Sequence, residues 1–373
     1  MGQRPSPVEG VVSVRLQAPD PAFWKGRRVL LTGHTGFKGS WMAWWLHRMG
    51  AKLHGLALAP ATQPALFDAL GLGRFLVHQV ADVRDPTAVA EAVRRSEPQV
   101  VLHLAAQALV RPGYEDPLGT FSTNVMGTAT VLNALRQAPE VKVALVVTTD
   151  KVYRNREWVY PYRETDALGG HDPYSASKAA SELVVDCWRA SWLQAQGLAV
   201  ASARAGNVIG GGDWSRDRLL PDAMRAWAAG QALEVRRPAA TRPWQHVLEP
   251  VGAYLRLAEA LWHGKVQPGA FNFGPAPQEA ATVREVIEQA RQAWGSGDVV
   301  WGDGQQGPHE AGWLALEVAK ARFELGVEPR WGLVQAVQRT MAWYRGHANG
   351  TSAEALCDAD LEAFAAGAPE DLP

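Results

Sequence analysis

The chain has 373 residues, a length that suggests roughly two domains and allows a substantial apolar core. Lysine and arginine number 37 against 38 aspartate and glutamate, so neither a nucleic-acid footprint nor an acidic tail is indicated. The two cysteines, Cys187 and Cys357, show no metal-ligand or disulfide spacing, and no apolar run reaches membrane-spanning length. We therefore expect a cytoplasmic, metal-free protein whose partners are small molecules or further copies of itself.

Strand-like and helix-like segments alternate through the first half of the chain, which is typical of an α/β fold with a doubly wound parallel sheet of the Rossmann type. Residues 29–32 are predicted as a strand that leads through a glycine-rich loop into a helix. Further strands are predicted to end at 55–58 and to cover 77–83, 100–104, 143–147 and 199–203. Helices are predicted over 88–96 and 124–136 and from Asp172-Pro173 onwards.

Beyond Gly210 this alternation gives way to segments rich in glycine, proline and tryptophan, the usual appearance of a smaller substrate-binding lobe. We predict an N-terminal extension over 1–22 and a dinucleotide-binding domain over 23–207 and 247–270. The lobe is predicted over 208–246 and 271–345, and a partly ordered tail over 346–373.

The glycine-rich loop reads Gly-x-x-Gly-x-x-Gly, which departs from the Gly-x-Gly-x-x-Gly of ordinary Rossmann dehydrogenases. Backbone amides at the start of a helix bind phosphate, and glycines let a pyrophosphate approach closely. The loop is therefore predicted to hold a dinucleotide through Gly33, Thr35, Gly36, Phe37, Lys38 and Gly39. The alternative is three ordinary turn glycines.

Tyr174 and Lys178 lie four residues apart in a predicted helix, so both side chains share one face. The Lys178 ammonium is predicted to favour the ionised Tyr174 phenol, whose ordinary pKa of ~10 has to fall by roughly three for it to act as a base at neutral pH. Lys178 together with the positive charge of an oxidised nicotinamide could supply this shift. Such a pair arises by chance in many chains, so the remaining residues must carry the functional prediction.

Thr148, Thr149, Asp150 and Lys151 follow the predicted strand 143–147, and ligands bind at the carboxyl ends of strands in such sheets. This segment brings a hydroxyl, a carboxyl and an amine to the same edge as the glycine loop. The set suits redox chemistry coupled to proton transfer.

Five segments carry a specific resemblance to a known family: residues 32–40 (TGHTGFKGS), 148–153 (TTDKVY), 162–177 (YRETDALGGHDPYSAS), 204–214 (RAGNVIGGGDW) and 242–250 (RPWQHVLEP). From about Phe23 to Tyr344 the chain resembles extended short-chain dehydrogenases that act on nucleotide sugars. Within that group it is most similar to the CDP-glucose 4,6-dehydratases. The resemblance implies CDP-glucose as substrate, a tightly held NAD, and a homodimer or homotetramer built on a helix bundle.

The implied activity removes water from CDP-glucose to give CDP-4-keto-6-deoxyglucose. Tyr174 would take the 4-hydroxyl proton while hydride passes from carbon 4 to NAD, and the ketone then makes the carbon-5 proton acidic. Lys151 is the predicted base at carbon 5, Asp150 the acid for the departing 6-hydroxyl, and Thr149 a donor to the 4-oxygen. The hydride returns to carbon 6. The non-catalytic alternatives are that Lys151 only orients the substrate or pairs with Asp150, and that Asp150 only caps a turn or a helix.

The cofactor preference is not decided by the residues, because residues 56–60 hold neither a carboxylate for the ribose nor an arginine for a 2′-phosphate. The resemblance favours NAD. It places Asn124 near the active site and the adenine and nicotinamide ends of the cofactor against Asp82, Val83, Leu104, Ala105, Ala106 and Gln107. Asn124 as a helix cap and Asp82 as a turn residue are the alternatives.

The substrate diphosphate requires cationic and amide donors, for which Asn207, Arg218, Arg242, His246 and Asn272 are the candidates. Surface or interface roles are the alternative for the arginines. Trp214 and Trp244 either stack on the base or fill the lobe's core. Two rival functions remain: a nucleotide-sugar 4-epimerase, and a non-catalytic dinucleotide-binding scaffold, which has no need of the Tyr174/Lys178 pair.

Overall fold

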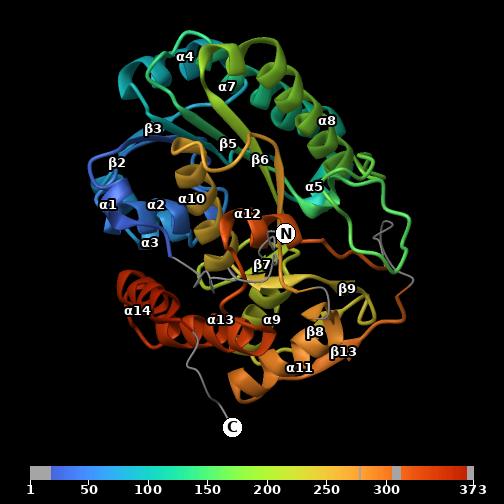
Figure 1. Cartoon of the computed structure of the whole chain (residues 1–373). Coiled ribbons are helices and arrows are strands. Elements are labelled where there is room, and N and C mark those ends of the chain that lie inside the picture. The colour runs from blue at the N-terminus through green and yellow to red at the C-terminus, as the bar shows by residue number, and fades with distance from the viewer. Residues whose placement is uncertain (1–17, 277–278, 305–311, 368–373) are drawn as a thin grey trace, which may run out of the picture.

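The computed structural model describes residues 18–276, 279–304 and 312–367 (Figure 1). A seven-stranded sheet dominates the N-terminal part, with the strand order β11-β6-β5-β4-β1-β2-β3 and every neighbouring pair parallel. The strands are β1 (Arg28–Thr32), β2 (Lys52–Ala57), β3 (Val77–Val80), β4 (Val100–His103), β5 (Val143–Val147), β6 (Ala199–Ala205) and β11 (Ala270–Phe273). The predicted doubly wound parallel sheet is confirmed. Its order reverses between β1 and β4, where such sheets bind ligands.

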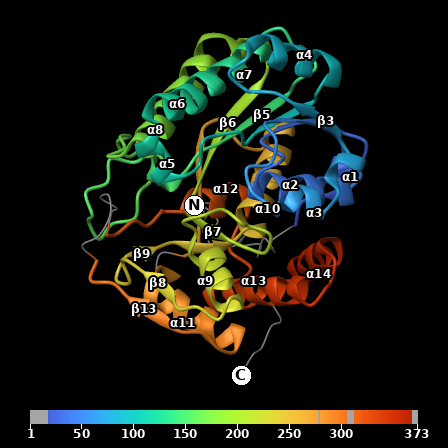
Figure 2. The ribbon, with the colours of Figure 1, turned by 180° about the vertical axis from the view of Figure 1, so that it is seen from behind.

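Helices cover both faces of this sheet (Figures 1 and 2). One face carries α4 (Pro86–Ser96), α7 (Gly127–Leu135) and α8 (Pro173–Trp188). The other carries α2 (Phe37–Arg48) and α10 (Leu248–Trp262). Short helices connect these elements: α1 (Pro21–Trp24), α3 (Leu66–Ala69), η1 (Leu72–Arg74), α5 (Val110–Glu115), α6 (Pro117–Phe121), η2 (Ser122–Met126), η3 (Asp150–Val152), η4 (Arg189–Leu193) and η5 (Gln194–Gln196).

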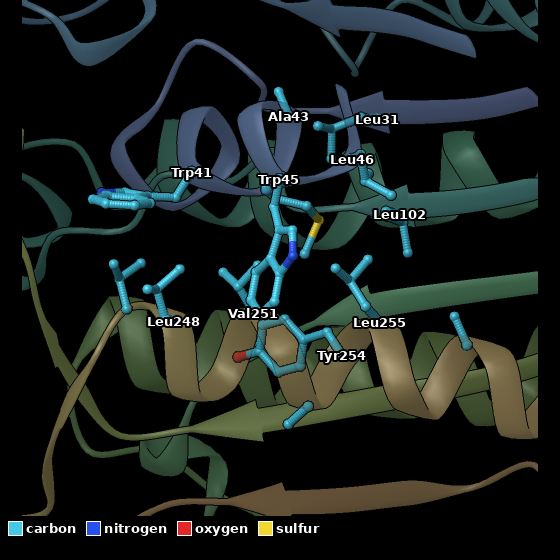
Figure 3. Close-up of a cluster of buried hydrophobic side chains, with 14 of the residues drawn as sticks. Leu31, Trp41, Ala43, Trp45, Leu46, Leu102, Leu248, Val251, Tyr254 and Leu255 are labelled. Carbon is cyan, nitrogen blue, oxygen red and sulfur yellow. The ribbon is translucent and has the colours of Figure 1, made fainter. Parts of the chain in front are cut away.

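The apolar strand runs are explained by burial on both faces, since successive strand residues point to opposite sides. Leu30 and Val101 join the cluster under α4, α7 and α8, whereas Leu31 and Leu102 join the cluster under α2 and α10. Figure 3 shows the second cluster, in which Trp45 of α2 points towards Val251 and Tyr254 of α10. A Cβ atom at Gly252 would lie 3.1 Å from the Trp45 ring, so this glycine allows the two helices to pack closely.

The lobe lies below the carboxyl end of the sheet (Figure 1) and consists of three two-stranded sheets with three helices. The strand pairs are β7 (Asn207–Ile209) with β10 (Trp244–His246), β9 (Thr241–Arg242) with β12 (Ala281–Thr282), and β8 (Leu233–Val235) with β13 (Val299–Trp301). The helices are α9 (Leu219–Ala228), α11 (Val283–Trp294) and α13 (Leu333–Ala348), which enclose a separate apolar core.

The C-terminal segment differs from the predicted tail. Helix α14 (Ala353–Ala366) buries Cys357, Leu361 and Phe364 in the core shared with α2. Phe364 also packs edge-on against Trp331 at a ring-centroid distance of 5.2 Å. The spacing of four and three residues between these apolar side chains is the signature of one helix face, and it could have been recognised in the sequence. Residues 368–373 lie outside the described part of the chain, as do residues 1–17 of the predicted extension.

Two further boundaries lie elsewhere than predicted. Strand β11 crosses the predicted domain boundary at residue 270 and pairs with β6, and α12 (Ala319–Leu325) packs on β11 although its residues were assigned to the lobe. Strand β3 ends at Val80, three residues early, because it is an edge strand whose Val77 and Val80 are exposed. Within the described residues, no helix has the length and apolarity that a membrane span requires.

Candidate active site

A cavity of about 1460 Å³ lies between the carboxyl edge of the sheet and the lobe. Its lining comes from the loops after β1, β2, β3, β4 and β5, from the start of α8, and from lobe residues around β7, β8 and β9. Single small-molecule sites usually occupy roughly 300–1,000 Å³. The cavity is therefore large enough for a dinucleotide together with a second ligand of similar size.

The glycine loop forms one wall of this cavity. Gly33 has a φ of +75°, and a Cβ atom there would lie 2.6 Å from the Ala105 backbone nitrogen. A Cβ at Gly39 would lie 2.1 Å from the Gly33 carbonyl oxygen, so only glycine fits at both positions. Gly36 is the N-cap of α2, and its side-chain-free backbone leaves the first amides of the helix facing the cavity. This geometry suits a pyrophosphate and disfavours the interpretation as ordinary turn glycines.

The residues predicted to hold the rest of the dinucleotide line the same cavity: Thr35, Phe37, Lys38, Asp82, Val83, Leu104, Ala105, Ala106 and Gln107. Asp82 accepts hydrogen bonds from the backbone and the guanidinium of Arg84, which hold the pKa of the carboxyl below its usual range. Beyond β2 the lining consists of Leu58, Ala59 and Ala61, and it includes no charged side chain.

Asn124 is not a helix cap. It lies within the π-helical turn η2, and its side-chain oxygen accepts from the Gln107 amide at 2.9 Å while its nitrogen donates to Gln107 O and to Ser177 Oγ. A π-helical turn of this kind often marks a functional site. Asn124 thereby ties the loop after β4 to helix α8, and it lies behind the cavity wall that Gln107 forms.

Thr149, Asp150 and Lys151 gather at the end of β5. Asp150 is fully buried, and its Oδ1 accepts hydrogen bonds from Thr149 Oγ1 at 3.0 Å and from Lys151 Nζ at 2.9 Å. Lys151 Nζ also reaches Asn207 Oδ1 at 3.3 Å. Asp150 Oδ2 is buried and has no hydrogen-bond partner within the described residues. A carboxyl and an amine are therefore held side by side, as the pairing alternative for Lys151 anticipated.

Tyr174 enters the cavity from the first turn of α8, which Asp172 caps by accepting from the Ser175 amide. Burial raises the pKa of the Tyr174 phenol, and a hydrogen bond to Thr149 offsets this only in part. Lys178 donates from Nζ to the Val147 carbonyl at 3.2 Å, and burial lowers its own pKa to about 8. The predicted fall of the Tyr174 pKa requires Lys178 together with an oxidised nicotinamide; in the protein without a cofactor, burial outweighs the lowering by Thr149 and Arg218.

A buried ionic network beneath these residues escaped sequence analysis. Glu182 of α8 pairs with Arg204 of β6 at 2.9 Å, and it also accepts from Thr148 Oγ1 and Ser202 Oγ. Arg204 continues the network to the Tyr153 hydroxyl at 2.8 Å. Since both charges are satisfied by several hydrogen bonds, the network fixes the end of β5 against α8.

Lys38 has a setting that its place in the motif does not reveal. Its ammonium lies 3.5 Å from the Tyr254 hydroxyl, and burial, followed by the positive charges of Arg218 and Lys178, lowers its pKa to about 7. Lys38 is thus, after Lys178, the second amine that lines the cavity with a lowered pKa, and it lies close to Asp150 and Lys178.

Three of the five predicted substrate residues line the cavity on the lobe side: Asn207, Arg218 and Arg242. Arg218 donates to the Ala108 carbonyl at 3.3 Å, and Arg242 donates to the Thr241 carbonyl at 2.8 Å. These contacts fix the orientation of the two guanidinium groups.

The other two predicted substrate residues lie away from the cavity. His246 is fully buried between Trp41 and Trp331 and lies 4.0 Å from Asp360 of α14. Asn272 is fully buried in β11, where its side chain bonds the Tyr153 hydroxyl and the carbonyls of Tyr162 and Glu317. The structure therefore corrects both assignments: these side chains are occupied by contacts within the protein.

The two tryptophans fill the lobe. Trp244 is buried and donates from its indole to the Ala281 carbonyl at 3.0 Å, and Trp214 packs edge-on against Trp343. Neither lines the cavity, so neither is in place to stack on a base.

Several charged residues of the cavity lining were not predicted, and three of them form one cluster. Arg111 follows Val110 in α5, Asp217 precedes α9, and Arg236 follows β8. No motif connects these positions, and only the fold brings them together. The described residues contain no group of three or more potential metal ligands.

Comparisons with known proteins show the family to which the chain belongs. The family model for GDP-mannose 4,6-dehydratase matches residues 30–340. The chain is 44% identical over 338 residues to a CDP-glucose 4,6-dehydratase of Salmonella typhimurium, covering 89% of this chain and 94% of the relative. It is 31% identical over 335 residues to a dTDP-glucose 4,6-dehydratase of Streptomyces antibioticus, covering 85% and 92%.

Solved structures support the fold. The dTDP-glucose 4,6-dehydratase of Bacillus anthracis in complex with NAD superposes with a TM-score of 0.74 at 20% identity, covering 87% of this chain and 98% of that one. The UDP-glucose 4-epimerase of Thermotoga maritima with UDP-glucose gives 0.75 at 21% identity, covering 86% and 99%. At these identities the likeness establishes the fold and does not separate the two activities. The family-model match and the sequence relatives together show that this chain belongs to the GDP-mannose 4,6-dehydratase family of extended short-chain dehydrogenases.

Proposed function

We propose that the protein is an NAD-dependent CDP-glucose 4,6-dehydratase, which converts CDP-glucose into CDP-4-keto-6-deoxyglucose. One observation carries the proposal: Lys151 and Tyr174 line one cavity together with the glycine loop, and Lys151 is paired there with the buried Asp150. A carboxyl and an amine held 2.9 Å apart are the acid and base that elimination of water requires, whereas epimerisation at carbon 4 requires neither.

The residues present fit a dinucleotide. Gly33 and Gly39 leave room where a Cβ atom would clash, and the start of α2 directs amides into the cavity. Asp82 and Val83 would hold the adenine end, and Leu104 to Gln107 the nicotinamide ribose. Bound NAD would supply the acceptor of hydride from the sugar's carbon 4 and the donor that returns it to carbon 6. Its positive charge would also lower the pKa of Tyr174, which burial raises in the protein alone.

In the first stage, Tyr174 takes the proton of the substrate's 4-hydroxyl. Its hydrogen bond to Thr149 orients the phenol, and Thr149 in turn contacts the Asp150 carboxylate. Lys178 also lines the cavity and donates to the Val147 carbonyl. These contacts keep the base at the carboxyl end of β5, where the sugar must lie.

In the second stage, one proton moved across the 2.9 Å contact from Lys151 to Asp150 gives a neutral amine beside a neutral carboxyl. The amine removes the carbon-5 proton, and the carboxyl gives its proton to the 6-hydroxyl, which departs as water. Elimination thus restores the ion pair, and the Lys151 ammonium can return a proton to carbon 5. Lys151 is 27% exposed, so this proton exchanges with solvent.

The proposal is tested by incubating the purified protein with CDP-, dTDP-, UDP- and GDP-glucose and measuring product masses. We expect loss of one water from CDP-glucose, with slower reaction of the other three. A hexose product of unchanged mass would instead identify a 4-epimerase, and the absence of turnover with bound NAD would favour the non-catalytic scaffold.

We also propose that the protein forms a homodimer through α5, α6, η2 and α8, which lie along one side of the sheet (Figure 2). Five large apolar side chains are exposed on these elements: Tyr114, Leu118, Phe121, Met126 and Leu183, of which Leu118 is 83% exposed. Patches of this kind mark protein interfaces. Light scattering should report a dimer, and Leu183→Glu should shift it towards the monomer. A wild-type monomer at micromolar concentration would contradict this proposal.

A further inference from the structure

An internal ionic cluster occupies the lobe side of the cavity. Asp217 Oδ1 lies 3.0 Å from Arg111 Nη1 and 3.5 Å from Arg236 Nη2. Arg111 belongs to helix α5 beside the sheet, and Arg236 follows strand β8 of the lobe. All three side chains line the cavity. One carboxylate oxygen therefore joins two arginines from different parts of the fold.

Two guanidinium groups that converge on one oxygen form an arrangement that also suits a phosphate oxygen. The three side chains are 33%, 41% and 36% exposed for Arg111, Asp217 and Arg236, so the contacts remain open to solvent. Partly exposed ion pairs contribute little net stability. A doubly charged ligand with several acceptor oxygens can therefore compete with the Asp217 carboxylate for both arginines.

The backbone keeps Asp217 in place. Its φ of 59° is in the left-handed region, which aspartate and asparagine tolerate better than most residues. The next residue, Arg218, donates to the Ala108 carbonyl at 3.3 Å and leads directly into α9. The carboxylate can leave the arginines by rotation of its side chain, while the segment itself stays across the cavity.

We propose that Asp217 is a displaceable internal anion, which holds Arg111 and Arg236 in position until the diphosphate of the substrate replaces it. The inference rests on the proposed function, because it requires a ligand with a diphosphate. It assigns Asp217 as a positioning residue that lowers the cavity's affinity for the nucleotide while it orders the two arginines.

The test measures binding of CDP and of cytidine by calorimetry to wild-type protein, Asp217→Asn and Asp217→Gly. Both substitutions suit a left-handed backbone and remove the charge. Since exposed charge pairs have small energies, we expect CDP to bind about two- to fivefold more tightly to Asp217→Asn, with cytidine unchanged. The matched control is Asp222→Asn, which removes a carboxylate that pairs with Arg225 outside the cavity lining and should leave CDP binding unchanged.

A double-mutant cycle adds a second criterion. Arg111→Gln should weaken CDP binding, and the gain from Asp217→Asn should shrink in that background because one displaced contact is already gone. Weaker or unchanged CDP binding in both Asp217 variants, or an equal gain for cytidine, would overturn the inference. If the wild type binds CDP but leaves CDP-glucose unreacted, the proposed reaction fails while the Asp217 inference is still tested.

Discussion

Two groups of residues at the cavity, here called the catalytic end and the phosphate end after the roles proposed for them, are built differently. At the catalytic end, Asp150, Tyr174 and Lys178 are all less than a tenth exposed, and their partners come from β5, α8 and the adjacent loops. At the phosphate end, Arg111, Asp217 and Arg236 are each about a third or more exposed and come from three separate segments. Packing thus fixes the groups proposed to move protons, whereas ion pairs gather the groups proposed to hold the nucleotide. Substitutions at the first end should change turnover, and those at the second should change affinity.

The largest effect is expected for Tyr174→Phe. Loss of a positioned base typically costs 10²- to 10⁴-fold in rate, and we expect kcat for CDP-glucose to fall by about that much with little change in CDP affinity. Tyr160→Phe is the control, since Tyr160 is 66% exposed and outside the cavity lining. A Tyr174→Phe enzyme with altered KM and normal kcat would contradict the claim that substitutions at the catalytic end change turnover rather than affinity.

The Asp150–Lys151 pair should separate oxidation from elimination. We expect Lys151→Met to lower dehydration by about 10²-fold or more and to accumulate the 4-ketoglucose intermediate without solvent deuterium at carbon 5. Asp150→Asn should stall at the same stage but retain part of the carbon-5 exchange, because proton removal survives. Dehydration at the original rate in Lys151→Met would show that Lys151 is not the base and only orients the substrate.

Salt should act on the phosphate end alone. Raising the ionic strength from about 0.01 M to 0.15 M shortens the screening length from about 30 Å to 8 Å, which weakens partly exposed charges much more than buried ones. We expect KM for CDP-glucose to rise several-fold while kcat changes by less than about twofold. An equal fall in kcat would mean that screened charges also control the chemistry.

The smallest predicted effect concerns stability and separates it from catalytic pH effects. Glu249 is buried in the first turn of α10 and accepts from the Arg330 and Trp331 amides, and burial raises its pKa to about 8. A pKa raised above its unfolded value stabilises the fold below about pH 4.5, and this contribution is lost as pH rises towards 8. We expect the midpoint of thermal unfolding to fall over this range, and to fall less in Glu249→Gln. An unchanged slope in the variant would contradict the assignment.

The contrast between the two ends also explains what could be predicted from the sequence. The glycine loop, the strand that delivers Asp150 and the helix of Tyr174 and Lys178 are local patterns, and the structure places them as expected around one cavity. His246 and Asn272 were misassigned because a buried polar residue and a ligand-binding one look alike in a sequence. Arg111, Asp217 and Arg236 were missed because only tertiary folding brings α5, β8 and the start of α9 together.

The dependence on tertiary contacts also explains where other segments of the structure differ from the sequence prediction. Helix α14 has apolar residues at helical spacing, Cys357, Leu361 and Phe364, which the sequence alone could show. Its contacts with α2, however, depend on the fold. The Glu182–Arg204 network joins α8 to β6. Arg204 begins the 204–214 segment, but nothing in that segment indicates Glu182 as its partner. Long-range charge pairing of this kind leaves no local signal, even where it supports the site.

The most direct test of the central claim follows deuterium through the reaction of CDP-[4-²H]glucose in ordinary water. Oxidation, elimination and return of the hydride at this one site predict a product that has lost water and carries the deuterium at carbon 6. The same reaction of unlabelled substrate in D₂O should place solvent deuterium at carbon 5. Deuterium that remains at carbon 4 of a hexose of unchanged composition would contradict the account and identify epimerisation.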